Sequence, residues 1–140
     1  MSLEQNKALD YQWYERINAH DLEGALALVS PDFVDHENPT APGGLEGLRR
    51  FFTMQLAAFP DMHATMLDQF AEGDKVVHRI QVEGTHQGTL MGIPPTGKRV
   101  KFTLIDIIRV AEGKMAEHWG ETDIMGLMQQ LGVVPPPSSR

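Results

Sequence analysis

The sequence predicts an α+β fold in which helices come first and a curved antiparallel or mixed sheet follows. Between residues 3 and 59 apolar side chains recur at helical spacing, whereas from Met62 onward they alternate with polar ones, as in strands that bury one face. Tight-turn signals at Glu72-Gly73-Asp74 and Glu112-Gly113 join neighbouring antiparallel strands. Helices covering one face of this sheet would make a cone whose interior is a pocket for a small molecule.

The composition indicates a single domain and excludes several classes of function. With 140 residues and 41% hydrophobic content, we place one domain at residues 1–132 and a flexible Pro/Ser tail at residues 133–140. The net charge of −7 provides no basic surface for nucleic acid, and the absence of cysteine excludes disulfides and thiolate chemistry. No apolar run approaches the roughly 20 residues of a membrane span, and the N-terminus lacks a signal-peptide pattern. We therefore expect a cytoplasmic protein that binds neither nucleic acid nor membrane.

Two helices are predicted at the start of the chain. Apolar residues recur every fourth position from Leu9 to Ile17, which is one face of an amphipathic helix over residues 3–19. Asp21 is suited to cap a second helix, because its carboxylate can accept from the free backbone N–H groups of the first turn. Ser30-Pro31 ends that helix.

A loop and a third helix follow. The segment at residues 32–44, DFVDHENPTAPGG, is too rich in Pro, Gly and Asp for regular structure beyond a short strand at residues 33–36. Apolar side chains from Leu45 to Phe59 then return to helical spacing, and Pro60-Asp61 stops the helix. The loop is expected to cross one end of the fold.

The C-terminal part is predicted to contain four strands and a closing helix. Residues 88–98, GTLMGIPPTGK, hold three glycines and two prolines, and we expect a rigid loop over an opening. Ile124 to Leu131 should form a short helix that Gly132 closes. The predicted strands lie at residues 62–71, 75–87, 99–111 and 114–123.

Three segments of the chain resemble the SnoaL-like polyketide cyclase (ester cyclase) family: DFVDH at 32–36, GTHQGTLMGIPPTGKRVKF at 84–102 and IDIIRVAEGKMAEHWGETDIMGLMQQLG at 105–132. The resemblance implies the cystatin-like or nuclear transport factor-like fold, and an enzyme that closes a ring of a polyketide ester by intramolecular aldol condensation. It implies no metal or other cofactor, a small hydrophobic carbonyl-containing substrate and a homodimer through the outer face of the sheet. The isoleucines on both faces of strand 99–111 are consistent with a sheet covered on both sides.

Asp123 is the position that matches the family's acid/base aspartate. An aldol closure begins when a base removes a proton from a carbon next to a carbonyl, and burial beside Trp119 would raise the carboxyl pKa toward working pH. His118 and His86 are further catalytic candidates, as proton donors or orienting partners. Simple alternation nevertheless places His118 on the opposite face from Trp119 and Asp123, unless a bulge at Gly120 intervenes.

Six further residues are expected to contact substrate. Asp106 lies among isoleucines, where a carboxylate needs a partner, and Arg79 on the neighbouring strand is the expected one. Three other histidines, His20, His63 and His78, are interpreted as surface or packing residues. The substrate-contact candidates are His36, Arg79, Asp106, Trp119, Trp13 and Phe52.

Other interpretations of the same residues stay open. Asp123 directly precedes an apolar helix and could be only its N-cap, and the aromatic residues could be only core. The cone could instead serve a hydrolase that activates water, an isomerase, or a binding domain without catalysis. No HExxH or HxH pattern or local carboxylate cluster indicates a metal site, so none is expected.

Overall fold

The computed structural model describes residues 2–37 and 43–135. Part of the predicted loop at 32–44 and most of the predicted tail at 133–140 therefore lie outside the described residues. The elements in chain order are α1 (Leu3–Asn18), α2 (Leu22–Leu26), β1 (Val29–Asp35), α3 (Gly44–Ala58), β2 (His63–Glu72), β3 (Lys75–Thr85), β4 (Arg99–Ala111), β5 (Lys114–Thr122) and α4 (Ile124–Leu131).

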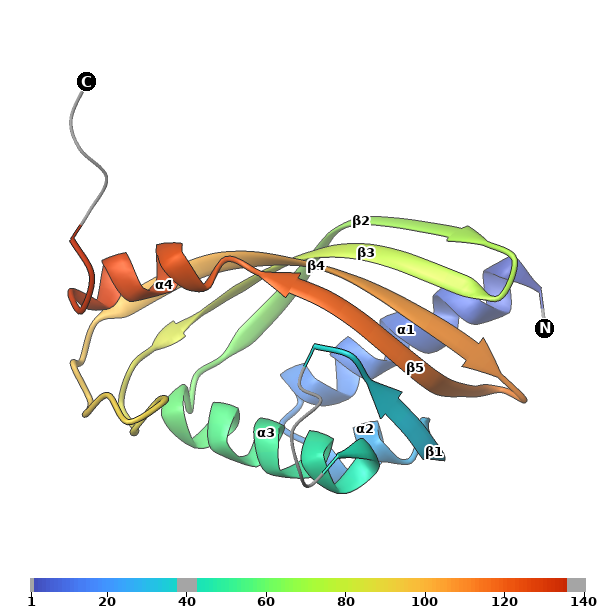
Figure 1. Cartoon of the computed structure of the whole chain (residues 1–140), viewed down its shortest axis with the longest axis horizontal. Helices are drawn as coiled ribbons and strands as arrows, with labels where there is room; N and C mark the ends of the chain where they lie inside the picture. The colour runs from blue at the N-terminus through green and yellow to red at the C-terminus, as the bar shows by residue number, and fades with distance from the viewer. Residues whose placement is uncertain (1, 38–42, 136–140) are drawn as a thin grey trace.

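The five strands form one curved mixed sheet in the order β1-β5-β4-β3-β2. β1 pairs parallel with β5, and all other neighbouring strands are antiparallel. Figure 1 shows α1, α2 and α3 on the concave side of the sheet and α4 beside one end of it. The predicted α+β fold, with a curved sheet and helices on one face, is confirmed.

The two short turns form where the sequence predicts them. Gly73 has φ 60°, and Glu112 and Gly113 have φ 51° and 75°, so the second turn takes two consecutive residues with positive φ. This conformation suits the twist of a two-residue hairpin. The boundaries of two other elements differ from the prediction. The second helix ends at Leu26 rather than near residue 29, and the strand predicted at 33–36 begins at Val29, because Met115 N–H donates to the Leu28 carbonyl and draws this segment onto the sheet.

Strict alternation along β4 decides which side chains face the helices. Phe102, Asp106 and Ile108 point to the concave side and are buried, whereas Ile105 is 51% exposed on the outer side. The same alternation puts His118 inside and Trp119, which pairs with the outward Ile107, outside. The sheet therefore carries charged groups into its own concave face.

The core lies between that concave face and the helices. Ile17 from α1, Phe59 after α3, Ile80 from β3 and Leu127 from α4 are almost completely buried in it. None of the described helices is long and apolar enough to cross a membrane. The outer face of the sheet exposes some apolar side chains, Ile105 among them, and the predicted homodimer through this face stays a prediction.

Candidate active site

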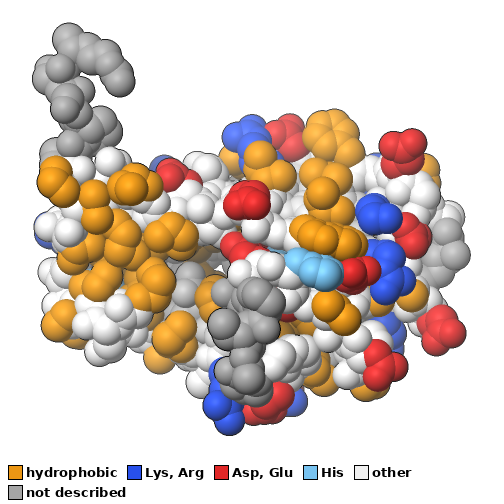
Figure 2. Space-filling model, viewed as in Figure 1, with side chains coloured by type: hydrophobic (Ala, Val, Ile, Leu, Met, Phe, Trp, Pro, Cys, Tyr) orange, Lys and Arg blue, Asp and Glu red, His pale blue; other side chains and the backbone are white. Residues whose placement is uncertain are grey.

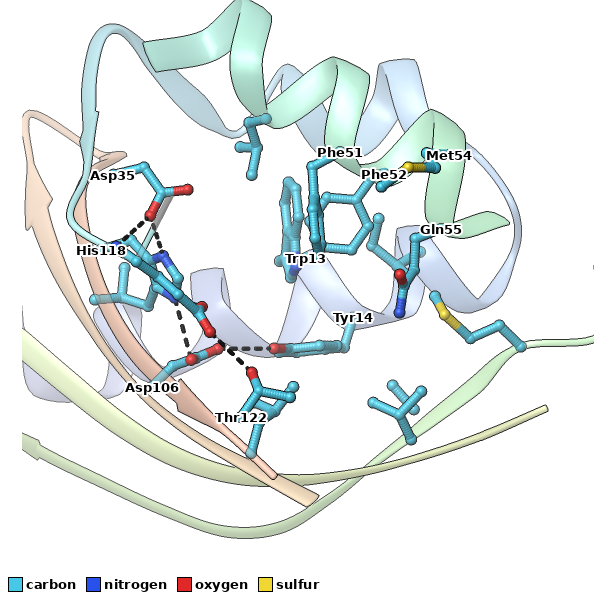
Figure 3. A pocket seen from close by; sticks show the side chains of 18 of the residues that line it. Trp13, Tyr14, Asp35, Phe51, Phe52, Met54, Gln55, Asp106, His118 and Thr122 are labelled. Atoms are coloured by element: carbon cyan, nitrogen blue, oxygen red, sulfur yellow. Dashed lines mark hydrogen bonds and ion pairs between the residues drawn. The ribbon is translucent and has the colours of Figure 1, made fainter. Parts of the chain in front are cut away.

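A cavity of about 370 Å³ opens between the concave face of the sheet and helices α1 and α3. Figure 3 shows its two unlike sides: Trp13, Phe51 and Phe52 form an aromatic wall, and polar side chains from the sheet face this wall across the open space. Trp13 meets Phe52 edge to face, with ring centroids 5.3 Å apart. The volume suits a small organic molecule whose apolar surface would lie on the aromatic wall.

A series of alternating carboxylates and imidazoles lies on the polar side. We call its five residues the carboxylate–imidazole cluster: Asp10, His78, Asp106, His118 and Asp35. His78 Nδ1 lies 2.9 Å from Asp10 Oδ1, and His78 Nε2 lies 2.9 Å from Asp106 Oδ2. The other oxygen of Asp106 lies 3.1 Å from His118 Nε2, and His118 Nδ1 lies 2.9 Å from Asp35 Oδ1. Asp106 therefore joins two imidazoles, each backed by a second carboxylate.

Three further polar side chains surround the cluster. The Tyr14 hydroxyl lies 3.0 Å from His78 Nε2 and 3.4 Å from Asp106 Oδ2. Glu37 Oε2 accepts a hydrogen bond of 2.8 Å from the Thr122 hydroxyl, and Glu37 Oε1 lies 3.6 Å from His118 Nε2. Tyr14, Glu37 and Thr122 all line the cavity. The cluster thus has three polar neighbours at the cavity surface.

Strand register explains how residues distant in the sequence meet here. His78 on β3 pairs directly with Asp106 on β4, and Asp106 pairs with Gly120 on β5. His118 lies two residues before Gly120, so its side chain falls on the same inward face. Asp10 and Tyr14 are four residues apart on α1, which places both on one face of that helix.

Both imidazoles are held in the protonated form. Burial alone would lower the pKa of His78, but the hydrogen bonds and negative charges of Asp10 and Asp106 outweigh it and raise the pKa to about 9. Burial likewise opposes the charge of His118, and Asp106 and Asp35 raise its pKa to about 10. At neutral pH the cluster therefore presents two imidazolium groups, which can donate but cannot accept protons.

The acids near the imidazolium groups differ in basicity. Burial favours the neutral form of Asp106, but the close positive charge of His118 and the hydrogen bond and charge of His78 outweigh it, so its pKa is lowered. The pKa of Glu37 is raised, mainly by burial, which outweighs the Thr122 hydrogen bond. Desolvation and then the charges of Asp106 and Asp10 raise the pKa of Tyr14 well above its ordinary value. Asp106 is thus a stable anion, while Glu37 is the more basic carboxylate.

Among the described residues, Glu37, Asp106 and His118 have the composition of a small cation site. Each offers one atom, and these atoms lie within 4.8 Å of one another. A metal would require His118 as neutral imidazole, because an imidazolium nitrogen has no free lone pair. With a His118 pKa of about 10, a proton competes for that place at neutral pH. The arrangement favours proton transfer over metal binding.

The structure places Asp123 differently from the prediction. Its side chain is exposed, is absent from the cavity lining, and accepts a hydrogen bond of 2.9 Å from the Gly126 backbone N–H as the N-cap of α4. The physical reason is that β5 ends at Thr122, so the next residue turns into the helix instead of continuing the inward face. The predicted buried carboxylate beside Trp119 is therefore not formed, and Asp106 holds the position in the cavity.

The predicted pairing of Arg79 with Asp106 is wrong. Arg79 Nε donates to Asp68 Oδ2 at 2.7 Å on the outer face of the sheet. An irregularity in β2 between Met66 and Asp68 brings Asp68 opposite Arg79, while Asp106 points to the other face. Asp106 itself lines the cavity, with His78 and His118 as its partners.

Two predicted histidines lie outside the cavity lining. His36 is exposed, stacks on Trp119 with ring centroids 4.9 Å apart, and lies 2.6 Å from Glu117 Oε2 on the outer face. His86 is completely buried, and its Nδ1 accepts from the Thr96 backbone N–H at 3.2 Å. His86 therefore fixes the connection between β3 and β4.

Trp13, Phe52 and His118 line the cavity, as the sequence predicts. His78, which the sequence indicates to be a surface or packing residue, also lines it. Alternation along β3 could have placed His78 on the inward face, because it lies two residues from each of the buried Val76 and Ile80. The other polar residues that sequence reasoning missed are Asp10, Tyr14, Asp35, Glu37 and Thr122.

Two curated relatives carry a named activity. DnrD of Streptomyces peucetius, an aklanonic acid methyl ester cyclase, is 28% identical over 107 residues, which cover 76% of this chain and 73% of that protein. DauD of Streptomyces sp. (strain C5), also an aklanonic acid methyl ester cyclase, is 28% identical over 104 residues, covering 74% of this chain and 64% of that protein. The similarity thus includes most of the described fold.

Solved structures and a family profile agree with these relatives. AclR of Streptomyces galilaeus, a candidate hydroxylase, has a TM-score of 0.88 and 34% identity, covering 98% of this chain and 87% of that one. IdmH of Streptomyces antibioticus, a candidate polyketide cyclase, has a TM-score of 0.80 and 34% identity, covering 91% of this chain and 99% of that one. The profile of SnoaL-like polyketide cyclases matches residues 8–131. The chain therefore belongs to the SnoaL-like polyketide cyclase family, and it is an enzyme of that type.

Proposed function

We propose that the protein closes a ring in a carbonyl-rich, polyketide-like ester by intramolecular aldol condensation, without a metal or other cofactor. The observation that carries this proposal is Asp106, a buried carboxylate joining two imidazolium groups at the polar side of an otherwise apolar cavity. The methyl ester cyclases DnrD and DauD support the class of substrate.

The chemistry requires only proton transfers and a folded substrate. A base removes a proton from a carbon beside a carbonyl, and the resulting enolate carbon attacks a second carbonyl of the same molecule. The new alkoxide then takes up a proton, so substrate and product are isomers. His118 can donate toward the enolate or alkoxide oxygen, and a donor already in place in a water-poor site stabilises such charge more than water does.

The aromatic wall would hold the substrate in a folded conformation. Trp13, Phe51 and Phe52 offer apolar surfaces opposite the cluster, and a flexible substrate held between them would have its two carbonyl groups close together (Figure 3). Such positioning can contribute more to the rate than the proton transfers, which supply about 10² to 10⁴-fold. The aspartate in this account is Asp106 rather than Asp123, and it acts by keeping both imidazoles charged.

The test is a product assay with the methyl ester of a carbonyl-rich polyketide acid. We expect a product of unchanged mass and shifted chromatographic retention, formed equally fast after prolonged chelation. A product containing oxygen from labelled water would indicate hydrolysis instead, and a product with one added oxygen atom would indicate hydroxylation, for which AclR is a candidate. Failure of every such ester to react while binding in the cavity would favour a binding domain.

A further inference from the structure

The polar side of the cavity is closely packed at Gly120. This residue lies on β5 and pairs with Asp106, so any side chain here would point into the cavity. A methyl group on Gly120 would overlap Asp106 Oδ1 and lie 2.6 Å from Glu37 Oε1 and 2.8 Å from His118 Nε2. Glycine therefore lets polar atoms from three separate segments come together here, and these atoms fill the space in front of it.

Asp106 is poorly suited to remove a proton from a molecule in the cavity. Its Oδ2 is occupied by His78 and lies near the Tyr14 hydroxyl. Its Oδ1 is buried and faces His118 Nε2 at 3.1 Å, although the two groups are not aligned for a hydrogen bond. Two imidazolium groups next to one carboxylate stabilise the anion, and a stabilised anion is a weak base.

Glu37 differs from Asp106 in each of these respects. Glu37 lines the cavity, and because its Oε2 is held by the Thr122 hydroxyl, Oε1 is the oxygen assigned to the substrate. The His118 Nε2 atom lies 3.6 Å from Glu37 Oε1, which is beyond hydrogen-bond length, and the Glu37 side chain is 26% exposed. Burial and the negative charges of Asp106 and Asp35 raise its pKa. Glu37 thus combines a fixed position with higher basicity.

We propose that Glu37 is the catalytic base of this enzyme and that the reacting carbon and its carbonyl group lie in the cavity beside Glu37 and His118, both of which line it. This inference rests on the proposed aldol condensation and names the group that carries out its proton transfers. Glu37 Oε1 takes the proton, and the electron pair of the broken C–H bond moves onto the carbonyl oxygen beside His118. The enolate then forms the carbon–carbon bond, and the alkoxide recovers a proton from the Glu37 carboxyl, which returns to its starting charge.

The direct test is Glu37→Gln, which keeps the shape and the contact with Thr122 but removes the basic oxygen. We expect kcat to fall by about 10² to 10⁴-fold with little change in KM, because the lost contribution is acid–base catalysis. Glu121→Gln is the matched control, since Glu121 lies on the same strand with its side chain exposed and paired opposite Ile105. Both variants should unfold at a temperature close to that of the wild type.

Thr122→Val provides a readout that a merely structural role of Glu37 would not change. The Thr122 hydrogen bond favours the charged form of Glu37, while Asp106, His118 and Asp35 are the charged groups that also face it. Removing that bond should raise the pKa of Glu37, and the acid limb of the kcat/KM profile should move to higher pH. An acid limb that stays in place in Thr122→Val would overturn the assignment of Glu37 as the base.

Two comparisons separate this inference from the proposed function. If Glu37→Gln cyclises substrate at the wild-type rate while Asp106→Asn does not, the cyclase assignment stands and Glu37 is not the base. If no ester is cyclised by the wild type, the proposed function fails, and the titration of Glu37 by carbon-13 NMR still decides the local claim. We expect an elevated pKa that rises further in Thr122→Val, and an ordinary or lowered pKa would contradict the inference.

Discussion

Replacing Asp106 by Asn is expected to lower turnover of a cyclised ester by about 10²-fold or more. Asn keeps the size of the side chain but removes the negative charge that His78 and His118 share. Both imidazoles would then lose protons more easily, and the donor beside the enolate oxygen would be neutral at working pH. The measurement is kcat and KM for the same ester used with the wild type, with the larger change expected in kcat.

The matched control is Asp123→Asn, since Asp123 is the aspartate that the sequence resemblance selects. Asn caps a helix about as well as Asp, so α4 should stay intact and turnover should remain within a few-fold of the wild type. If Asp106→Asn does not fold, His118→Gln tests the same donor. Loss of turnover in Asp123→Asn with full turnover in the cluster variants would reject the account.

Stability should fall steeply as the pH rises above neutral. His78 and His118 have folded pKa values of about 9 and about 10, both above the ordinary value of 6.5. A raised folded pKa means that the folded state binds protons more tightly than the unfolded state. The stabilisation is therefore complete below pH 6.5 and is lost as the pH passes through 9 and 10. The expected loss is on the order of a few kcal/mol, measured by urea unfolding at a series of pH values.

His118→Gln should flatten this dependence, because the variant cannot bind the proton that the wild type releases. His20→Gln is the corresponding control, since His20 is an exposed residue after α1 and should leave the slope unchanged. A free energy of unfolding that stays constant between neutral pH and pH 10 in the wild type would show that the imidazoles are not held as cations in the folded state.

The fold could be predicted because its signals are local. Apolar side chains recur about every fourth residue from Leu9 to Ile17, which predicts α1, and they alternate with polar ones in β2 to β5, which predicts strands. The turn residues Glu112-Gly113 predict one of the hairpins. Alternation also predicted that His118 and Trp119 take opposite faces, as they do. In each case the relevant contacts lie within a few residues along the chain or across one turn.

The site could be predicted only in part because its contacts are distant in the sequence. Asp10 meets His78 across 68 residues, and Asp106 meets Tyr14 across 92, so no spacing pattern shows either contact. The partner of Arg79 depended on an irregularity in β2 that sequence periodicity does not reveal. The prediction for Asp123 was wrong because a residue at the junction of a strand and a helix can either line a pocket or cap the helix. Here the Asp123 carboxylate accepts a hydrogen bond from the Gly126 N–H and caps the helix.

The most direct measurement is a crystal structure with an unreactive β-dicarbonyl ester bound. The account predicts a carbonyl oxygen within hydrogen-bond distance of His118 Nε2, about 3 Å, with the adjacent carbon facing Glu37 Oε1 and the apolar part against Trp13 and Phe52. A ligand whose carbonyl groups point away from the carboxylate–imidazole cluster, toward the mouth of the cavity or toward Asp123, would contradict it.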